Sequence, residues 1–218
     1  MAKLVQNLGS FVPDNLIVDG SVPILTKAVT LEAGQGTLQR GTVLGKVTKA
    51  IGEEVVGPGE EKGTIGIIVL GKIAKLGTYT LTCTTATATA QGVPAVFEVI
   101  DPDGIRLGDA VAGEAYTGPI NFTITEAAGF AKGDVFTVTV IAGSGKYKKA
   151  DSTNVDGSQV ADCILADNVD TALDVTAIAY KTGHFNRKAL IVGDSDTVDM
   201  HEDKLRELGI FLSDNVPY

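Results

Sequence analysis

Strict alternation of apolar and polar residues runs through the middle of the chain. In residues 78–84, Tyr79, Leu81 and Cys83 alternate with threonines. The same pattern recurs at Phe97/Val99, at Phe122/Ile124 and at Phe136/Val138/Val140. Alternation of this kind, with Gly, Pro and Asp between the segments, predicts a half-buried antiparallel sheet or a small sandwich. We therefore expect residues 76–142 to form a compact β subdomain.

Shorter apolar runs on both sides of this subdomain predict further strands. One lies at residues 41–48, and three follow at residues 160–166, 175–180 and 189–192. These runs are rich in Val, Thr and other strand-forming residues. Residues 51–64 contain many glycines and glutamates together with a proline, so we expect an exposed loop there.

One helix is expected near the end of the chain, at about residues 197–208. Val198, His201, Leu205 and Leu208 recur at helical spacing, with acidic residues around the start and basic residues near the end. Gly209 is placed to terminate this helix. The expected fold class is therefore mainly β, a β-rich α+β fold with a single C-terminal helix.

The first 21 residues show neither helical nor strand periodicity. Pro13 interrupts any helix there, and Pro23 lies near the start of the extended segment 22–31 that follows. The apolar residues of the two segments include Phe11, Leu16, Ile17, Val22, Ile24 and Leu25. Two interpretations remain open: a tail that precedes the first strand, or an arm that orders against another chain.

Composition and charge exclude several classes of protein. The net charge is −9 and the only basic clusters, at residues 146–149 and 187–188, are short, so we expect no nucleic-acid binding. No apolar run reaches the roughly 18–20 residues that span a bilayer. The N-terminus lacks the pattern of a signal peptide. We expect a protein that is made in a cytoplasm and does not enter a membrane.

No arrangement of residues typical of catalysis is visible. The two histidines, His184 and His201, are isolated, and no Gly-x-Ser-x-Gly elbow lies near them. Cys83 and Cys163 belong to no metal-binding motif, and we expect two buried thiols, although spacing alone cannot exclude a disulfide. The sequence thus predicts no enzyme, no cofactor and no metal.

Two strings resemble ligand loops only in part. Residues 101–104 read Asp-Pro-Asp-Gly, but Ile105 and Ala112 occupy positions where an EF-hand needs oxygen ligands. A turn between strands explains this string. Residues 143–146 read Gly-Ser-Gly-Lys without the remaining residues of a phosphate loop, so we interpret the glycines as a hinge between subdomains.

Several short sequence strings occur along the chain in an order and spacing that resemble a known family. They are Val22-Pro23-Ile24, residues 41–46, Gly145-Lys146-Tyr147, and residues 156–161, 164–170, 184–190 and 205–210. Together they resemble the lambda-type head decoration proteins of tailed bacteriophages. Residues 77–83 and 99–104 resemble a segment of the larger members of that family.

This resemblance implies a small, mostly β, trimeric protein that sits on the outside of expanded phage heads and braces the shell. It implies an N-terminal arm that orders against the major capsid protein. The expected division is an extended arm at residues 1–21, a decoration core at 22–75 and 143–218, and an inserted β subdomain at 76–142. The first half of that core would carry the exposed loop at 51–64.

The expected function is that of a structural capsid decoration protein on the outer surface of the virion. The residues expected to contact the capsid are Phe11, Leu16, Ile17, Val22, Pro23, Ile24 and Leu25. Two alternatives stay open. One is another virion module, such as a tail tube or fibre, and the other is a carbohydrate-binding module in residues 76–142 with Tyr116 as the stacking platform.

Overall fold

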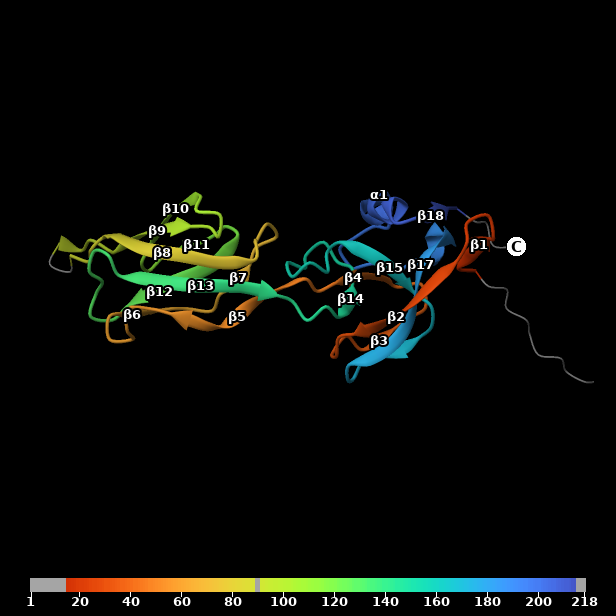
Figure 1. Ribbon diagram of the computed structural model, residues 1–218, viewed down its shortest axis with the longest axis horizontal. Helices are drawn as coiled ribbons and strands as arrows, with labels where there is room; N and C mark the ends of the chain where they lie inside the picture. The colour runs from red at the N-terminus through yellow and green to blue at the C-terminus, as the bar shows by residue number, and fades with distance from the viewer. Residues whose placement is uncertain (1–14, 89–90, 215–218) are drawn as a thin grey trace, which may run out of the picture.

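Two β lobes lie end to end in the computed structural model, which describes residues 15–88 and 91–214 (Figure 1). Both ends of the described chain, residues 15–48 and 143–214, build one lobe. Residues 49–142 build the other. We call them the barrel lobe and the sandwich lobe.

Five strands of the barrel lobe close into a ring. In ring order they are β2 (Leu25–Leu31), β17 (Val175–Asn186), β15 (Ala161–Leu165), β4 (Val43–Lys46) and β14 (Tyr147–Lys149). The ring closes because β14 pairs with β2 in parallel and β2 pairs with β17 in antiparallel. Its interior is apolar and includes Leu31, Leu44, Tyr147, Cys163 and Leu165. The contact that closes the ring is a single residue pair, Tyr147 with Leu31, and the rest of β2 pairs with β17.

A second apolar layer covers one side of the barrel. Strands β1 (Ile17–Asp19) and β18 (Ile210–Ser213) pair with the two edges of the end of β17. Helix α1 (Asp199–Glu207) follows a short 3-10 turn, Arg187–Ala189. The buried residues of this layer include Leu16, Val43, Ile164, Phe185, Leu205 and Ile210. A hairpin of β3 (Thr37–Leu38) and β16 (Val169–Asp170) lies beside the barrel.

The expected C-terminal helix is confirmed. Among the described residues α1 is the one α-helix, and His201 and Leu205 are its buried residues. Gly209 adopts a φ of 83°, a left-handed conformation that glycine provides at helix ends, and Ile210 behind it is fully buried. The prediction of a mainly β fold with one C-terminal helix is also confirmed.

Asp196 ties the start of the helix to the loop at residues 151–160. Its side chain is fully buried, and its Oδ2 lies 2.8 Å from Nε2 of His201. The same oxygen accepts the N–H of Ser152 at 2.6 Å, and the Ser152 hydroxyl donates to Oδ1. Burial acts to raise the pKa of Asp196, but the bonds from Ser152 and His201 outweigh it and hold that pKa below its usual value.

The sandwich lobe packs two antiparallel sheets face to face. The larger sheet has the order β10 (Arg106–Val111), β9 (Val96–Ile100), β8 (Gly77–Thr85), β13 (Val135–Ala142) and β5 (Lys49–Val56). In the smaller sheet, β12 (Ile120–Glu126) pairs with β11 (Ala115–Tyr116), β6 (Gly63–Ile65) and β7 (Val69–Leu70). The alternating residues meet between the sheets, including Tyr79, Phe97, Phe122, Phe136 and Val138.

The expectation of one exposed loop at residues 51–64 was wrong. Its first six residues all belong to β5, which pairs with β13, and its last two begin β6. A β-bulge between Ile51 and Val55 breaks the period of two that identifies a strand in a sequence. This pairing places residues 49–75 in the sandwich lobe, whereas the sequence analysis began the inserted segment at residue 76.

The chain crosses between the lobes twice, and the two crossings lie side by side. At Gly143 a Cβ would come within 2.6 Å of the Lys49 nitrogen, so only glycine fits there. The carbonyl of Asp156 accepts the N–H groups of Thr48 and Lys49 at 2.8 and 2.9 Å. Val155 of the same loop packs against the sandwich core. The loop at 151–160 therefore braces the junction.

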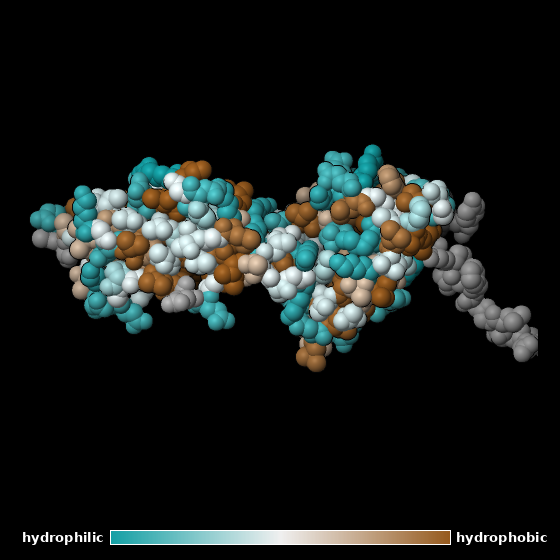
Figure 2. All heavy atoms as spheres, in the orientation of Figure 1, coloured by the Kyte–Doolittle hydropathy of each residue, from teal (hydrophilic) through white to brown (hydrophobic). Residues whose placement is uncertain are grey.

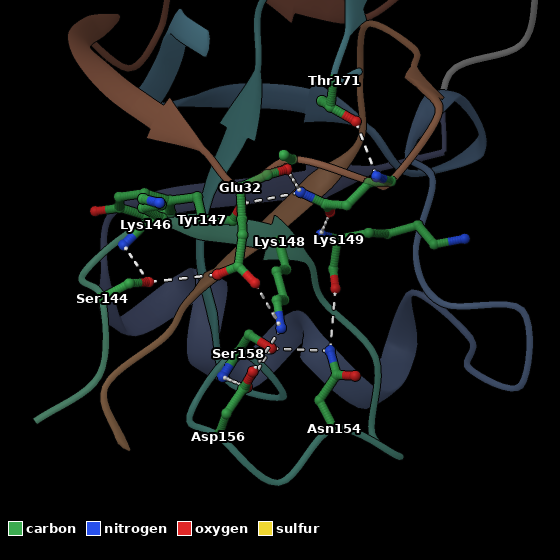
Figure 3. Close-up of polar contacts among 12 residues, drawn as sticks. Glu32, Ser144, Lys146, Tyr147, Lys148, Lys149, Asn154, Asp156, Ser158 and Thr171 are labelled. Atoms are coloured by element: carbon green, nitrogen blue, oxygen red, sulfur yellow. Dashed lines mark hydrogen bonds and ion pairs between the residues drawn. The ribbon is translucent and has the colours of Figure 1, made fainter. Parts of the chain in front are cut away.

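A polar network holds this loop against β14 (Figure 3). Lys148 Nζ lies 2.9 Å from Asp156 Oδ2 and 3.2 Å from Glu32 Oε1. Ser158 donates its hydroxyl to Asp156 Oδ1 at 2.6 Å and accepts from Asn154 Nδ2 at 2.9 Å. The network is partly buried, and each of its side chains has a hydrogen-bond or ion-pair partner. It therefore fixes the loop in one position.

Both cysteines are free and buried, as expected from the sequence. Cys83 lies in the sandwich core and Cys163 in the barrel interior, so they cannot pair with each other within one chain. Burial raises the pKa of the Cys163 thiol to about 12.

Replacing residues 49–142 with a short Gly/Ser linker should leave a folded barrel lobe. The barrel and sandwich cores are separate clusters, and the ends of the removed segment lie side by side at Gly143. Circular dichroism should show a cooperative thermal transition, and amide NMR signals should be dispersed. Segment 49–142, expressed separately, is the matched control. Collapse of the shortened protein to a poorly dispersed spectrum would show that the barrel depends on the sandwich lobe.

Asp196→Asn should flatten the acid side of the stability profile. Because the pKa of Asp196 is depressed in the folded protein, its contribution is complete above the unfolded value of about 3.9 and is lost as pH falls below it. The free energy of unfolding of the wild type should therefore fall more steeply between about pH 5 and pH 3 than that of the variant. Urea titrations measure this difference, with exposed Asp167→Asn as control. Parallel profiles would refute the assignment.

Candidate binding surface

The segment that the sequence analysis assigned to a contact arm runs along β17 from Asn15 onward. In β1, Ile17 lies opposite Phe185. The carbonyl of Leu16 accepts the N–H of Asn186 at 2.8 Å, and Leu16 is only 2% exposed. The Asn186 amide donates to the carbonyl and side-chain oxygens of Asn15 at 3.0 and 2.8 Å. Residues 15–17 are thus part of the folded body.

A turn at Asp19 continues this attachment. Asp19 Oδ1 accepts the N–H and hydroxyl of Ser21 at 2.9 and 2.5 Å and lies 3.1 Å from Nδ1 of His184. The bonds from Ser21, together with that from His184, lower the pKa of Asp19 to about 2. The side chain therefore stays ionised at neutral pH and keeps the turn against β17.

Thr182 of β17 fixes the next part of the segment. Its hydroxyl donates to the carbonyl of Pro23 at 2.7 Å and accepts the N–H of Leu25 at 3.1 Å. β2 then starts at Leu25 and pairs along β17. One strand therefore holds this segment at residues 15–19 and again at residues 23–25, with a bend at residues 20–22 between them.

The seven expected contact residues therefore divide into three groups. Phe11 lies outside the described residues. Leu16 is buried in the core, while Ile17 and Val22 are partly buried. Pro23, Ile24 and Leu25 are exposed. Residues 15–21 lie against the body because β17 supplies them with backbone and core partners.

Exposed apolar side chains lie on the segments that flank this end of β17. Leu25 is 59% exposed opposite Thr182, and Phe211 is 41% exposed opposite His184. Ile24 is 37% exposed beside Gly183. We call Ile24, Leu25 and Phe211 the end surface. Strands β1 and β18 lie at the end of the barrel lobe that faces away from the sandwich lobe (Figure 1), and hydrophobic residues are visible at that end (Figure 2).

Strand β18 was not expected from the sequence. The expected helix ended at Gly209, and no role was expected for Phe211. The sequence feature that could have indicated this strand is the apolar run at residues 210–212, directly after the terminating Gly209. A run of three residues is too short to distinguish a strand from a helix contact.

Tyr116, the expected sugar platform, faces inward. It lies opposite Phe122 in the β11–β12 pair, and the two rings stack at 4.9 Å with an angle of 25°. The Tyr116 ring packs on the sandwich core. On the outer side of this sheet, Ile67 is 90% exposed and Val69 is 50% exposed, and neither is aromatic.

The Asp-Pro-Asp-Gly string forms the expected turn. Asp101 Oδ1 accepts the N–H groups of Asp103 and Ile105 at 2.9 and 2.8 Å. Lys75 Nζ lies 2.7 Å from Asp101 Oδ2, and this bond is the main cause of the lowered pKa of Asp101. A lysine occupies the place next to the carboxylates that a calcium ion would need.

The described residues contain neither a candidate metal site nor a helix that could span a membrane. No group of three or more His, Cys, Asp or Glu side chains within residues 15–88 and 91–214 could hold a metal ion. In the same residues, no helix is long and apolar enough to cross a membrane.

Comparison with known proteins supplies the family. The model of a family described as bacteriophage lambda head decoration protein D matches residues 102–211, about half of the chain. The match begins in the sandwich lobe and covers β14, β15, β17 and α1, ending at Phe211 in the end surface. Searches of curated proteins and of solved structures gave no match. From this match, the chain belongs to the bacteriophage lambda head decoration protein D family.

Proposed function

We propose that this protein is a non-enzymatic decoration protein that binds the outer surface of the expanded phage head and stabilises the shell, with the major capsid protein as partner. The observation that carries the proposal is the family match, which includes β14, β15 and β17, three of the five strands of the ring. A net charge of −9 agrees with a place outside the shell, where the protein need not contact DNA.

The proposed contact region is the N-terminal segment together with the end surface. The N-terminal segment contributes Phe11, Leu16, Ile17, Val22, Pro23, Ile24 and Leu25, and the end surface adds Phe211. Ordering a free segment costs roughly 1–2 kcal/mol per residue. Because residues 15–25 already lie along β17, that cost is met during folding and does not weaken binding. Buried Leu16 and partly buried Ile17 would act by positioning Pro23, Ile24 and Leu25.

The sandwich lobe is proposed to project away from the head. It lies at the opposite end of the molecule from the end surface (Figure 1). The braced junction at Asp156 would hold it in that direction. No observation favours a tail-tube or fibre role, and the inward ring of Tyr116 leaves the carbohydrate-binding alternative without its expected platform.

The proposed assembly on the head is a trimer. Three copies arranged around a symmetry axis would multiply weak individual contacts, because each further arm binds at a high effective concentration.

Ile24→Asp should weaken head binding without unfolding the protein. Ile24 is 37% exposed, so a charge there would be tolerated in the free protein but would lose solvation in a contact. We expect a loss of about tenfold or more, ~1.4 kcal/mol, in co-sedimentation with expanded, undecorated heads. Leu173→Asp is the matched control, because Leu173 is 78% exposed in the turn before β17.

Truncation should be limited to residues 1–14, since a deletion that includes Leu16 would also remove a core residue. If Ile24→Asp and the truncated protein both decorate heads with wild-type affinity, the contact lies elsewhere on the body.

Cross-linking on decorated heads should give a trimer as the largest covalent species of this protein. The expectation rests on the family assignment. Gel electrophoresis after a time course of a short amine-reactive reagent gives the result. Accumulation of dimers, or of monomers alone, at full decoration would contradict the trimer.

A further inference from the structure

Strand β18 is an open sheet edge of the barrel lobe. Among the strands of residues 15–88 and 91–214, β18 pairs with β17 alone. In the ring, β17, β15 and β4 have neighbours on both sides, whereas β2 meets β14 only at Leu31. An open edge can accept a further strand from another chain through main-chain hydrogen bonds.

The register of β18 shows which backbone groups are available. The N–H of Gly183 donates to the carbonyl of Gly209 at 3.1 Å, and Gly183 lies opposite Ile210 in a parallel ladder. In such a ladder alternate residues bond to the same neighbour, so the backbone groups of Phe211 and Ser213 face β17. Those of Ile210 and Leu212 point to the open side.

The side chains of β18 favour a partner strand and do not block one. Ile210 is fully buried and Leu212 packs partly on the helix layer, so the strand is firmly seated. Phe211 is exposed on the other face, and β18 carries no charged residue and no proline. By contrast, β10 at the edge of the sandwich lobe has a bulge and a salt bridge between Arg106 and Asp109. Bulges and charges are the usual protection of an edge.

We propose that β18 takes an added strand from the head shell protein: an extended, uncharged segment with an apolar side chain that packs on Phe211. The proposal rests on the proposed function. We assign the added strand to the shell protein because β18 lies next to the proposed contact region: β18 and β2 flank the same strand, β17. The exposed Leu25 on β2 is therefore about two strand spacings, ~10 Å, from β18, and a partner that covers one reaches the other.

Leu212→Pro tests the hydrogen bond directly. Proline removes the outward N–H of residue 212 and leaves the ladder to β17 intact, as prolines on edge strands do. Leu212→Ala is the matched control, since it shortens the same side chain and keeps the N–H. We expect Leu212→Pro to bind expanded heads about two- to tenfold more weakly than Leu212→Ala, the effect of one net hydrogen bond.

Amide hydrogen exchange of the wild type supplies a second measurement that needs no variant. In the peptide covering residues 209–214, the amides of Ile210 and Leu212 should exchange fast in the free protein and slowly on heads. The amides of Phe211 and Ser213 should be protected in both states, because they bond to β17.

Three results would overturn the proposal. The first is equal head binding by the two Leu212 variants. The second is unchanged exchange of Ile210 and Leu212 on heads that carry the protein. The third is full protection of both amides in the free protein, which would assign the edge to another part of this chain or to a second copy. If the wild type fails to bind heads at all, the proposed function itself fails.

Discussion

The barrel lobe depends on the pairing of β17, whose 12 residues join four other strands. Its first half closes the barrel against β2 and β15, and its second half carries β1 and β18. Phe185 in the second half is fully buried in the layer under the helix. A substitution that disrupted this strand would both open the barrel and release the N-terminal segment. Folding and the proposed contact surface therefore depend on the same element.

This arrangement separates the two ends of the molecule. β17 gathers the N-terminal segment, β18 and the exposed apolar side chains at one end. The loop at 151–160 holds the sandwich lobe at the other through the Asp156 carbonyl and Val155. Because the brace is a partly buried polar network and not a flexible linker, an orientation set by the barrel lobe would be passed to the sandwich lobe. The exposed apolar residues of the sandwich lobe include Ile67 and Val69, on the outer face of its smaller sheet.

Sequence alone predicted the elements whose signals are local. The alternating residues around Tyr79 and Phe136 became the sandwich core, and the helix ended at Gly209 as expected. The two buried cysteines were also predicted correctly. In each case a period of two, a period of 3.6 or a single terminating glycine carries the information.

The elements that were missed depend on distant partners. β5 was taken for a loop because its bulge breaks the alternation, and only β13 reveals it as a strand. β1 and β18 are three and four residues long and exist because β17 lies between them. The network of Lys148, Asp156 and Glu32 joins residues far apart in the chain. No local pattern encodes contacts of this kind, so the candidate surface could be placed only in three dimensions.

In the proposed orientation, the end surface of the barrel lobe faces the head and the sandwich lobe faces outward. Cryo-electron microscopy of expanded, undecorated heads mixed with this protein would show this orientation. We expect density for residues 15–25 and β18 against the shell, and the sandwich lobe as the outermost feature. A map in which the sandwich lobe contacts the shell while Ile24, Leu25 and Phe211 face solvent would contradict it.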